Sequence, residues 1–313
     1  SMDIRQIEYI IAIEQEQSIS KAAEKLFLTQ SALNQQLLKL EKELGTPLFE
    51  RHKHSMIPTY AGRIYLNTAH LIADMKQETY RIIQDITKEN TGEIAVAHTP
   101  EAGAALFSRI YPIFHRKYPN ITFRIREERV KEMERLLLKK EVNFAGIAYY
   151  EASKHPDLEY IDMSSEKMVL GLPASHPLAE LAGNKSWESL PRLDLKLLKN
   201  EDFILLNKET RMRDMIDMSF QHAGFRPKIL FESVSTRTVI SMVANQIGPA
   251  FFPQSYVKPK DSSIVYFTVE PCLEWMRGVA FRKGCYLTKP EKYYIALMAD
   301  AHHEKLLESM GFL

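Results

Sequence analysis

The chain has 313 residues, of which 45% are hydrophobic and 26% are charged, and its formal net charge at pH 7 is +1. This composition is typical of a folded chain with more than one domain and excludes a disordered protein. It contains no run of about 18 or more apolar residues, no basic and apolar leader, and only two cysteines, Cys272 and Cys285, too few for a disulfide framework or a zinc site. We therefore expect a cytoplasmic protein without a membrane span, a metal site or a cofactor.

Three helices are predicted in the first part of the chain. Isoleucines recur at helical spacing over residues 3–17, and two further helices joined by a tight turn are predicted over residues 18–41. A Ser or Thr hydroxyl accepts hydrogen bonds from the unpaired N–H groups of a first helical turn, so Ser20 and Thr29 are the expected caps. The buried stripe of the last helix consists of three leucines: Leu33, Leu37 and Leu40.

The outward face of this third helix carries polar side chains, namely Gln30, Ser31, Asn34, Gln35 and Lys39. Gln and Asn can form two hydrogen bonds with the edge of an adenine base, which suits a helix that enters the major groove. An ordinary helical hairpin with a solvated polar face explains this stretch equally well. Residues 1–63 contain eight basic and eight acidic residues, so DNA binding here depends on where charges are placed and not on their excess.

A helix stop and a short β-hairpin are predicted next. Gly45 can adopt the left-handed cap, and Pro47 prevents the helix from continuing. In residues 48–59 two short apolar runs enclose a basic cluster of Arg51, His52, Lys53 and His54. Three helices followed by such a hairpin are typical of a winged helix-turn-helix, in which the tip of the hairpin contacts the DNA backbone.

Residues 2–63 resemble the DNA-binding domain of the LysR-type transcriptional regulators. The matches are Ser18, Ala22-Ala23, Leu26, Thr29-Gln30-Ser31-Ala32-Leu33, Leu40-Glu41, Leu44-Gly45-Thr46-Pro47-Leu48-Phe49-Glu50-Arg51 and Thr59-Tyr60-Ala61-Gly62. The chain departs from the family at Asn34-Gln35, where members often carry Ser followed by Arg, His or Gln. We therefore expect a different operator preference.

The resemblance implies a role for each exposed position of this domain. Bases are read by Gln30, Ser31, Asn34 and Gln35. Phosphates are held by Lys39, Arg51 and Lys53. Ser20 and Thr29, at the two helix caps, complete the predicted DNA-binding set. The partner is double-stranded promoter DNA, with RNA polymerase as a further partner.

A long helix without internal proline is predicted over residues 59–90. Its apolar residues follow the helical period, and about thirty residues make a rod of roughly 45 Å. Such a rod is too long to bury its stripe against a domain of this size, so we expect it to pair with the same helix of a second chain, as the family's linker helix does. The alternative is a helix that packs only on its own chain. The resemblance implies a homodimer through residues 59–90 and a homotetramer built from two such pairs.

From residue 91 onward, strands alternate with helices, which predicts parallel sheets with crossover helices. One set runs over residues 93–149, with a helix over 130–142, and a second set runs over 168–252. The stretches 155–165 and 257–270 are the expected crossings between two lobes. The expected domains are a winged helix-turn-helix (1–58), a linker helix (59–90) and an effector-binding domain (91–313), whose first lobe is 91–162 with 268–313 and whose second lobe is 163–267. The fold class is thus α and α/β multidomain, and the resemblance implies a two-lobed, periplasmic-binding-protein-like effector domain.

Ligands of open α/β sheets bind beyond the carboxyl ends of the strands, where helix N-termini present free N–H groups. The residues at these ends are His98, Thr99, Pro100, Glu101, Tyr149, Lys208, Thr210, Arg211, Ser235, Thr236 and Phe252. Thr99 and Thr210 match positions where the family commonly holds an effector carboxylate, although either hydroxyl could simply cap a helix. Glu101 suits an amine or is a solvated helix-start carboxylate. We expect a small anionic or zwitterionic effector that bears a carboxylate.

Two further groups of ionisable residues are expected at the surface without a functional role. Glu127-Glu128-Arg129 is expected to be a solvated run, and His302-His303 a surface pair. No phosphate loop, nucleophile elbow or zinc-protease motif occurs, so no enzyme is predicted. The sequence predicts a ligand-responsive transcriptional regulator. The alternative is a small-molecule binding protein whose N-terminal domain serves assembly only.

Overall fold

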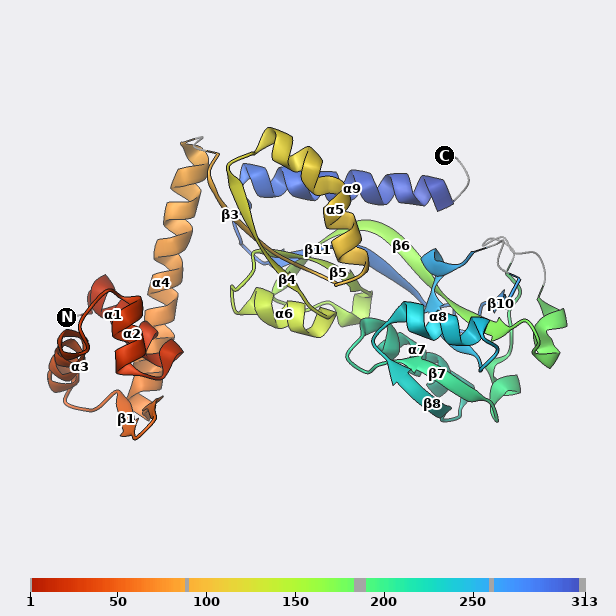
Figure 1. Cartoon of the computed structure of the whole chain (residues 1–313), viewed down its shortest axis with the longest axis horizontal. Coiled ribbons are helices and arrows are strands. Elements are labelled where there is room, and N and C mark those ends of the chain that lie inside the picture. The colour runs from red at the N-terminus through yellow and green to blue at the C-terminus, as the bar shows by residue number, and fades with distance from the viewer. Residues whose placement is uncertain (1, 88–89, 183–189, 259–261, 310–313) are drawn as a thin grey trace. The chain divides into compact units, whose positions relative to one another are not determined.

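The computed structural model describes residues 2–87, 90–182, 190–258 and 262–309 (Figure 1). The chain divides into two compact units, residues 1–89 and residues 90–313, and each is described by itself. Within the described ranges, no helix combines the length and the apolar character needed to cross a bilayer.

The first unit consists of three helices, a β-hairpin and a long helix. Its elements are α1 (Ile4–Glu16), α2 (Ile19–Lys25), α3 (Gln30–Leu44), β1 (Phe49–His52), β2 (Ser55–Pro58) and α4 (Tyr60–Ile86). The predicted apolar stripes are buried, since Ile10, Ile13 and Leu37 are at most 2% exposed. The hairpin is antiparallel and places Arg51 opposite Met56. The predicted winged helix-turn-helix is confirmed.

The helix cap of α3 is the one that the sequence predicted, and the cap of α2 is a different residue from the predicted one. Thr29 caps α3, where its Oγ1 accepts a hydrogen bond from the backbone N–H of Ala32 at 3.1 Å. The prediction for Ser20 was wrong: α2 begins at Ile19, and the cap is Ser18, whose Oγ accepts from the Lys21 N–H at 3.3 Å. Ser20 therefore lies exposed in the first turn, with its hydroxyl 3.0 Å from that of Ser18.

The long helix α4 is shorter than predicted at its C-terminal end. Thr59 caps its start by accepting from the Gly62 N–H at 3.0 Å, and the same hydroxyl donates to the Pro47 carbonyl at 2.7 Å. The helix ends at Ile86, and the Thr87 hydroxyl turns back to donate to the Gln84 carbonyl at 3.0 Å. The predicted continuation over residues 88–89 lies outside the described residues.

The second unit is built on one twisted sheet with helices on its faces. Its strands are β3 (Gly92–His98), β4 (Ile121–Glu127), β5 (Phe144–Tyr149), β6 (Leu158–Pro173), β7 (Asp202–Leu206), β8 (Lys228–Ser233), β9 (Ala250–Pro253), β10 (Ile264–Phe267) and β11 (Glu274–Arg282). Its α-helices are α5 (Ala102–Lys117), α6 (Val130–Leu138), α7 (Arg211–Ala223), α8 (Thr236–Ala244) and α9 (Lys289–Ser309). The strand order is β4-β3-β5-β11-β6-β9-β7-β8, and β10 pairs with β6.

Two lobes share this sheet, and each has its own core. In the first lobe, α5 and α9 cover one face and α6 covers the other (Figure 1). In the second lobe, α7 and α8 pack on β7 and β9 around Phe203, Phe251 and Phe252, which are fully buried. The two-lobed α/β architecture is confirmed, but the expectation of parallel sheets was wrong in part, because β6, β10 and β11 pair antiparallel with their neighbours.

The crossings between the lobes are strands, and one of them differs from the prediction. Residues 158–165 lie in β6, which runs without interruption from the first lobe into the second. The expected crossing over 257–270 contains β10, which pairs with Leu170 and its neighbours inside the second lobe. The chain returns later through β11, because Leu273 and Trp275 still pack in the core of the second lobe.

Candidate functional site

The exposed face of α3 carries the predicted base-reading residues. Leu33, Leu37 and Leu40 are at most 3% exposed, so the opposite side of the helix faces outward. This outward side presents Gln30, Ser31, Gln35 and Lys39, all exposed, and Asn34, which is half-buried. The side chains are therefore available to a partner that approaches this face.

A hydrogen bond connects the recognition helix to the wing. The guanidinium Nη1 of Arg51, on β1, donates to Oδ1 of Asn34, on α3, at 2.8 Å. Beneath them, burial raises the pKa of the Glu41 carboxyl, while the charge of Arg51 and the Leu48 N–H lower it. Lys53, at the tip of the hairpin, is exposed. Two predicted DNA-binding residues thus hold each other in place.

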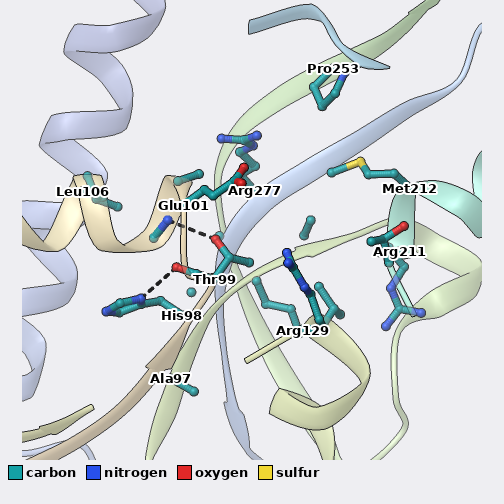
Figure 2. A pocket seen from close by; sticks show the side chains of 18 of the residues that line it. Ala97, His98, Thr99, Glu101, Leu106, Arg129, Arg211, Met212, Pro253 and Arg277 are labelled. Atoms are coloured by element: carbon teal, nitrogen blue, oxygen red, sulfur yellow. Dashed lines mark hydrogen bonds between the residues drawn. The ribbon is translucent and has the colours of Figure 1, made fainter. Parts of the chain in front are cut away.

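A cavity of about 150 Å³ lies in the second unit, at the carboxyl ends of β3 and β7 (Figure 2). The first residues of α5, α6, α7 and α8 all line it: Ala102, Val130, Arg211 and Thr236. Because a helix N-terminus carries free N–H groups and a partial positive charge, four of them favour negative charge at this place. Of the residues predicted at the site, the cavity is lined by His98, Thr99, Glu101, Thr210, Arg211 and Thr236.

The other predicted effector residues lie outside the lining of this cavity, for identifiable reasons. Tyr149 is 1% exposed and its hydroxyl donates to Asp162 at 2.5 Å. Phe252 is fully buried in the core of the second lobe. Ser235 caps α8 through the Thr238 N–H at 3.3 Å. The last two, Pro100 and Lys208, are exposed to solvent.

The two threonines that match the family's effector positions differ in their hydrogen bonds. Thr210 Oγ1 donates to the Asn207 carbonyl at 2.8 Å and accepts from the Arg213 N–H at 3.3 Å, so its hydrogen is already engaged in a cap. Thr99 Oγ1 accepts from the Gly103 N–H at 3.0 Å, and its own hydrogen has no acceptor among the described residues. Thr99 can therefore donate to a ligand, whereas Thr210 is a structural cap.

Arg211 was expected to hold an anion, but its charge is already compensated. Its side chain is 8% exposed and forms one ion pair with Glu134 of α6 and a second with Asp214, whose Oδ2 lies 3.9 Å from Arg211 Nη1. Burial raises the pKa of the Glu134 carboxyl, and the Arg211 charge opposes this rise. Arg211 thus links the two lobes beside the cavity. Its charge is paired, while its buried Nε has no hydrogen-bond partner among the described residues.

Two arginines that the sequence analysis did not place at the site also line the cavity. Arg277, on β11, forms an ion pair with the buried carboxylate of Glu166 at 2.7 Å. Arg129, interpreted above as solvated, precedes α6 and projects toward the middle of the cavity (Figure 2). No hydrogen bond or ion pair joins its guanidinium to another described residue. The strand-end rule could have found Arg129, because it lies in the turn between strand β4 and helix α6.

Other lining residues add a polar group and an apolar wall. Burial raises the pKa of the Tyr256 phenol, and the nearby Glu101 carboxylate acts in the same direction, so this phenol stays protonated. His302 was expected at the surface, but it lines the cavity, with its Nδ1 3.1 Å from the Ser164 hydroxyl. The apolar wall includes Leu106, Met212 and Met298. Among the residues that the structure describes, no group of three or more His, Cys, Asp or Glu side chains could hold a metal ion.

Two family profiles match the chain and together cover both units. The profile described as "Bacterial regulatory helix-turn-helix protein, lysR family" matches residues 4–63, and that of the "LysR substrate binding domain" matches residues 87–302. The chain belongs to the LysR family of transcriptional regulators. Like the other LysR-type regulators, it combines a helix-turn-helix with an effector-binding domain.

Individual relatives agree with this assignment over nearly the full length. The regulator AlsR of Bacillus subtilis (strain 168) is 30% identical over 291 residues, covering 90% of this chain and 91% of AlsR. YybE of the same organism, described as an uncharacterized HTH-type transcriptional regulator, is 28% identical. The match covers 92% of this chain and 94% of YybE. These relatives are transcriptional regulators and not enzymes, as the sequence predicted.

Solved structures show the same fold. A full-length variant of OxyR from Pseudomonas aeruginosa superimposes with a TM-score of 0.66 at 24% identity, covering 97% of this chain and 95% of that one. Full-length CbnR complexed with its target DNA gives a TM-score of 0.56 at 19% identity, covering 96% and 100%. At such identities the likeness concerns the fold of a LysR-type regulator alone.

Proposed function

We propose that this LysR-type regulator binds promoter DNA through α3 and the wing, and that a small carboxylate-bearing effector in the cavity changes how it binds. The observation that carries this proposal is the exposed polar face of α3, joined to the wing by Asn34 and Arg51. Amide side chains on this face suit base edges, and Arg51 and Lys53 suit phosphates. CbnR, whose fold is similar, has been seen in complex with its target DNA. Such a regulator acts in the bacterial cytoplasm, where the chromosome lies.

Dimerisation through α4 is the second part of the proposal. One side of α4 packs on its own chain through Tyr65, Leu66 and Ala69. Another side leaves large apolar residues in solvent: Tyr60, Ile64, Leu71, Met75, Ile83 and Ile86 are each at least 53% exposed. Since exposed apolar stripes of this length mark interaction surfaces, they support pairing with a second copy.

A further surface supports a tetramer. The edge strand β8 leaves Ile229, Leu230 and Phe231 between 36% and 46% exposed. An exposed apolar edge strand is an association site unless something covers it. Pairs formed through α4 and contacts at β8 would together assemble four chains, which fits repeated half-sites on DNA.

The test is binding of the full chain to the DNA upstream of its own coding region, measured by fluorescence anisotropy at several salt concentrations. We expect salt-sensitive binding that weakens at least about fivefold in Gln35→Ala, because a base contact is worth roughly 1–3 kcal/mol. The matched control is Gln77→Ala, an exposed glutamine of α4. If the wild-type chain does not bind, the N-terminal domain serves assembly only. If the chain binds but Gln35→Ala binds as tightly as Gln77→Ala, Gln35 on the exposed face of α3 does not read a base.

A further inference from the structure

The turns after β3 and β4 lie next to each other at one edge of the first lobe. β3 and β4 are parallel neighbours, with His98 opposite Glu127. Beyond the last pair, the backbone N–H of Glu128 donates to the His98 carbonyl at 3.0 Å, which holds the two turns together. Side chains from both turns therefore face the same cavity.

These turns supply two charged groups of opposite sign that lack partners. Glu101 comes from the turn after β3, and Arg129 from the turn after β4. Both line the cavity, and neither side chain forms a hydrogen bond or an ion pair with any residue in the described ranges. By contrast, the other two arginines of the lining, Arg211 and Arg277, are paired with Glu134 and Glu166.

Thr99 lies between these two charges in the view of Figure 2, and Glu101 is on the side of Arg277. The hydroxyl hydrogen of Thr99 is available, because Thr99 Oγ1 only accepts a hydrogen bond, from the Gly103 N–H. A carboxylate held by the guanidinium of Arg129 can therefore accept a second hydrogen bond from Thr99. The edge of the first lobe thus offers a carboxylate position and, beyond it, an ammonium position.

A ligand with only a negative charge fits this cavity less well. It would compensate Arg129 but cover the Glu101 carboxylate without giving it a partner, and burial of an unpaired charge is costly. The cavity of about 150 Å³ is comparable in volume to one that admits a six-carbon ring. Its wall beyond the charged groups is apolar, with Leu106, Met212 and Met298.

We propose that the effector is a zwitterion, an α-amino acid or a compound with the same two charged groups, whose carboxylate binds Arg129 and Thr99 and whose ammonium group binds Glu101. The side chain of this ligand occupies the apolar part of the cavity. The inference rests on the proposed function, because it names the ligand of the cavity through which the regulator responds.

The test is thermal unfolding and titration calorimetry of the full chain with each standard L-amino acid. Each amino acid is compared with the acid that lacks its amino group and the amine that lacks its carboxylate; for L-leucine these are 4-methylpentanoate and 3-methylbutylamine. We expect at least one amino acid to raise the Tm, and both of its analogues to bind at least about tenfold more weakly, since each loses a charge-assisted contact.

Two variants assign the charges to their residues. Arg129→Met is expected to bind the amino acid no better than it binds the amine, and Glu101→Gln no better than it binds the deaminated acid. A folding defect would weaken all three ligands together. The matched controls are Arg126→Met and Glu127→Gln on β4, which change the same charges outside the lining of the cavity and are expected to bind as the wild type.

The proposal is overturned if no amino acid binds, if the deaminated acid binds as tightly as the amino acid, or if Arg129→Met and Glu101→Gln bind like their controls. Operator binding, measured on the same preparations, separates this outcome from a failure of the proposed function. A chain that binds its operator but not a zwitterion remains a regulator with another effector. If the wild-type chain does not bind DNA, the proposed function is wrong, and the calorimetry still identifies the class of ligand that the cavity binds.

Discussion

Arg51 of the wing donates a hydrogen bond of 2.8 Å to the side-chain oxygen of Asn34 on the recognition helix. Asn34 is a position where, by the resemblance stated above, we expect the chain to depart from residues common in the family. The bond uses one of the two lone pairs of the amide oxygen, and no other described residue accepts from the amide N–H₂ group. Asn34 therefore orients the wing arginine and keeps only part of its capacity for reading a base.

The first prediction concerns this pair. Because Asn34 positions Arg51, we expect Asn34→Ala and Arg51→Ala each to weaken operator binding, and the double variant to be about 1 kcal/mol less affected than the sum. Arg51→Ala should also reduce the dependence of log K on log salt by about one unit, as for one lost phosphate contact. Anisotropy titrations at several salt concentrations measure both. Additive losses would mean that the bond has no role in the complex.

The second prediction concerns the exposed stripe of α4. Met75 is 70% exposed and Leu71 is 59% exposed on the same side of the helix. A charge placed in a buried apolar interface costs several kcal/mol, so Met75→Asp is expected to shift the chain from dimer to monomer. Sedimentation velocity over a range of concentrations measures the change. Gln77→Asp, an exposed position away from this stripe, is the control, and equal dissociation of both variants would contradict pairing through the stripe.

The third prediction separates the two threonines of the cavity. Thr210→Val removes the cap of α7, so we expect a loss of about 1 kcal/mol in the free energy of unfolding, with effector affinity little changed. Thr99→Val removes a hydroxyl that can donate to the ligand, so we expect effector affinity to fall about tenfold. Urea titrations and calorimetry measure the two quantities. The opposite pattern would place the ligand carboxylate at Thr210.

The fourth prediction concerns alkaline pH. Burial, with the hydrogen bond to Asp162, raises the pKa of the Tyr149 phenol above its ordinary value of 10.0, and burial does the same for Tyr294. Above that pH the unfolded chain loses these protons while the folded chain keeps them, so stability falls as the pH rises above about 10. We expect this fall to be less steep in Tyr149→Phe.

Urea unfolding at a series of pH values from about 8 to 11 measures this slope. Tyr80→Phe is the control, because Tyr80 is 68% exposed and its replacement should leave the slope unchanged. If the slope of Tyr149→Phe equals that of Tyr80→Phe, the buried phenol does not govern the alkaline loss of stability.

Much of the fold could be predicted because its signals are local. Thr29 caps the helix that begins at the next residue, and Gly45 has the left-handed φ of 74° that its place after α3 requires. The choice between Ser18 and Ser20 is not local. It depends on Ile19, which is 8% exposed and packs in the core, so that α2 begins two residues earlier than a cap at Ser20 would place it.

The cavity could be predicted only in part, for a similar reason. His98, Thr99 and Glu101 follow a parallel strand and lie where the strand-end rule places them. Arg277 lies on β11, which is antiparallel to both of its neighbours, so that rule does not apply to it. The pairing of Arg211 with Glu134 joins residues that are 77 positions apart in sequence, and no local pattern reports it.

The way in which the lobes are joined restricts how an effector can act. β6 and β11 both pass from one lobe to the other, and they remain paired with each other along the crossing. The irregularity of that pairing falls between Arg277 and Gly278, two residues of the cavity wall. Strands that stay hydrogen-bonded resist separation more than they resist a change of twist. We therefore expect effector binding to rotate one lobe relative to the other about the paired strands β6 and β11, with the pivot beside the ligand.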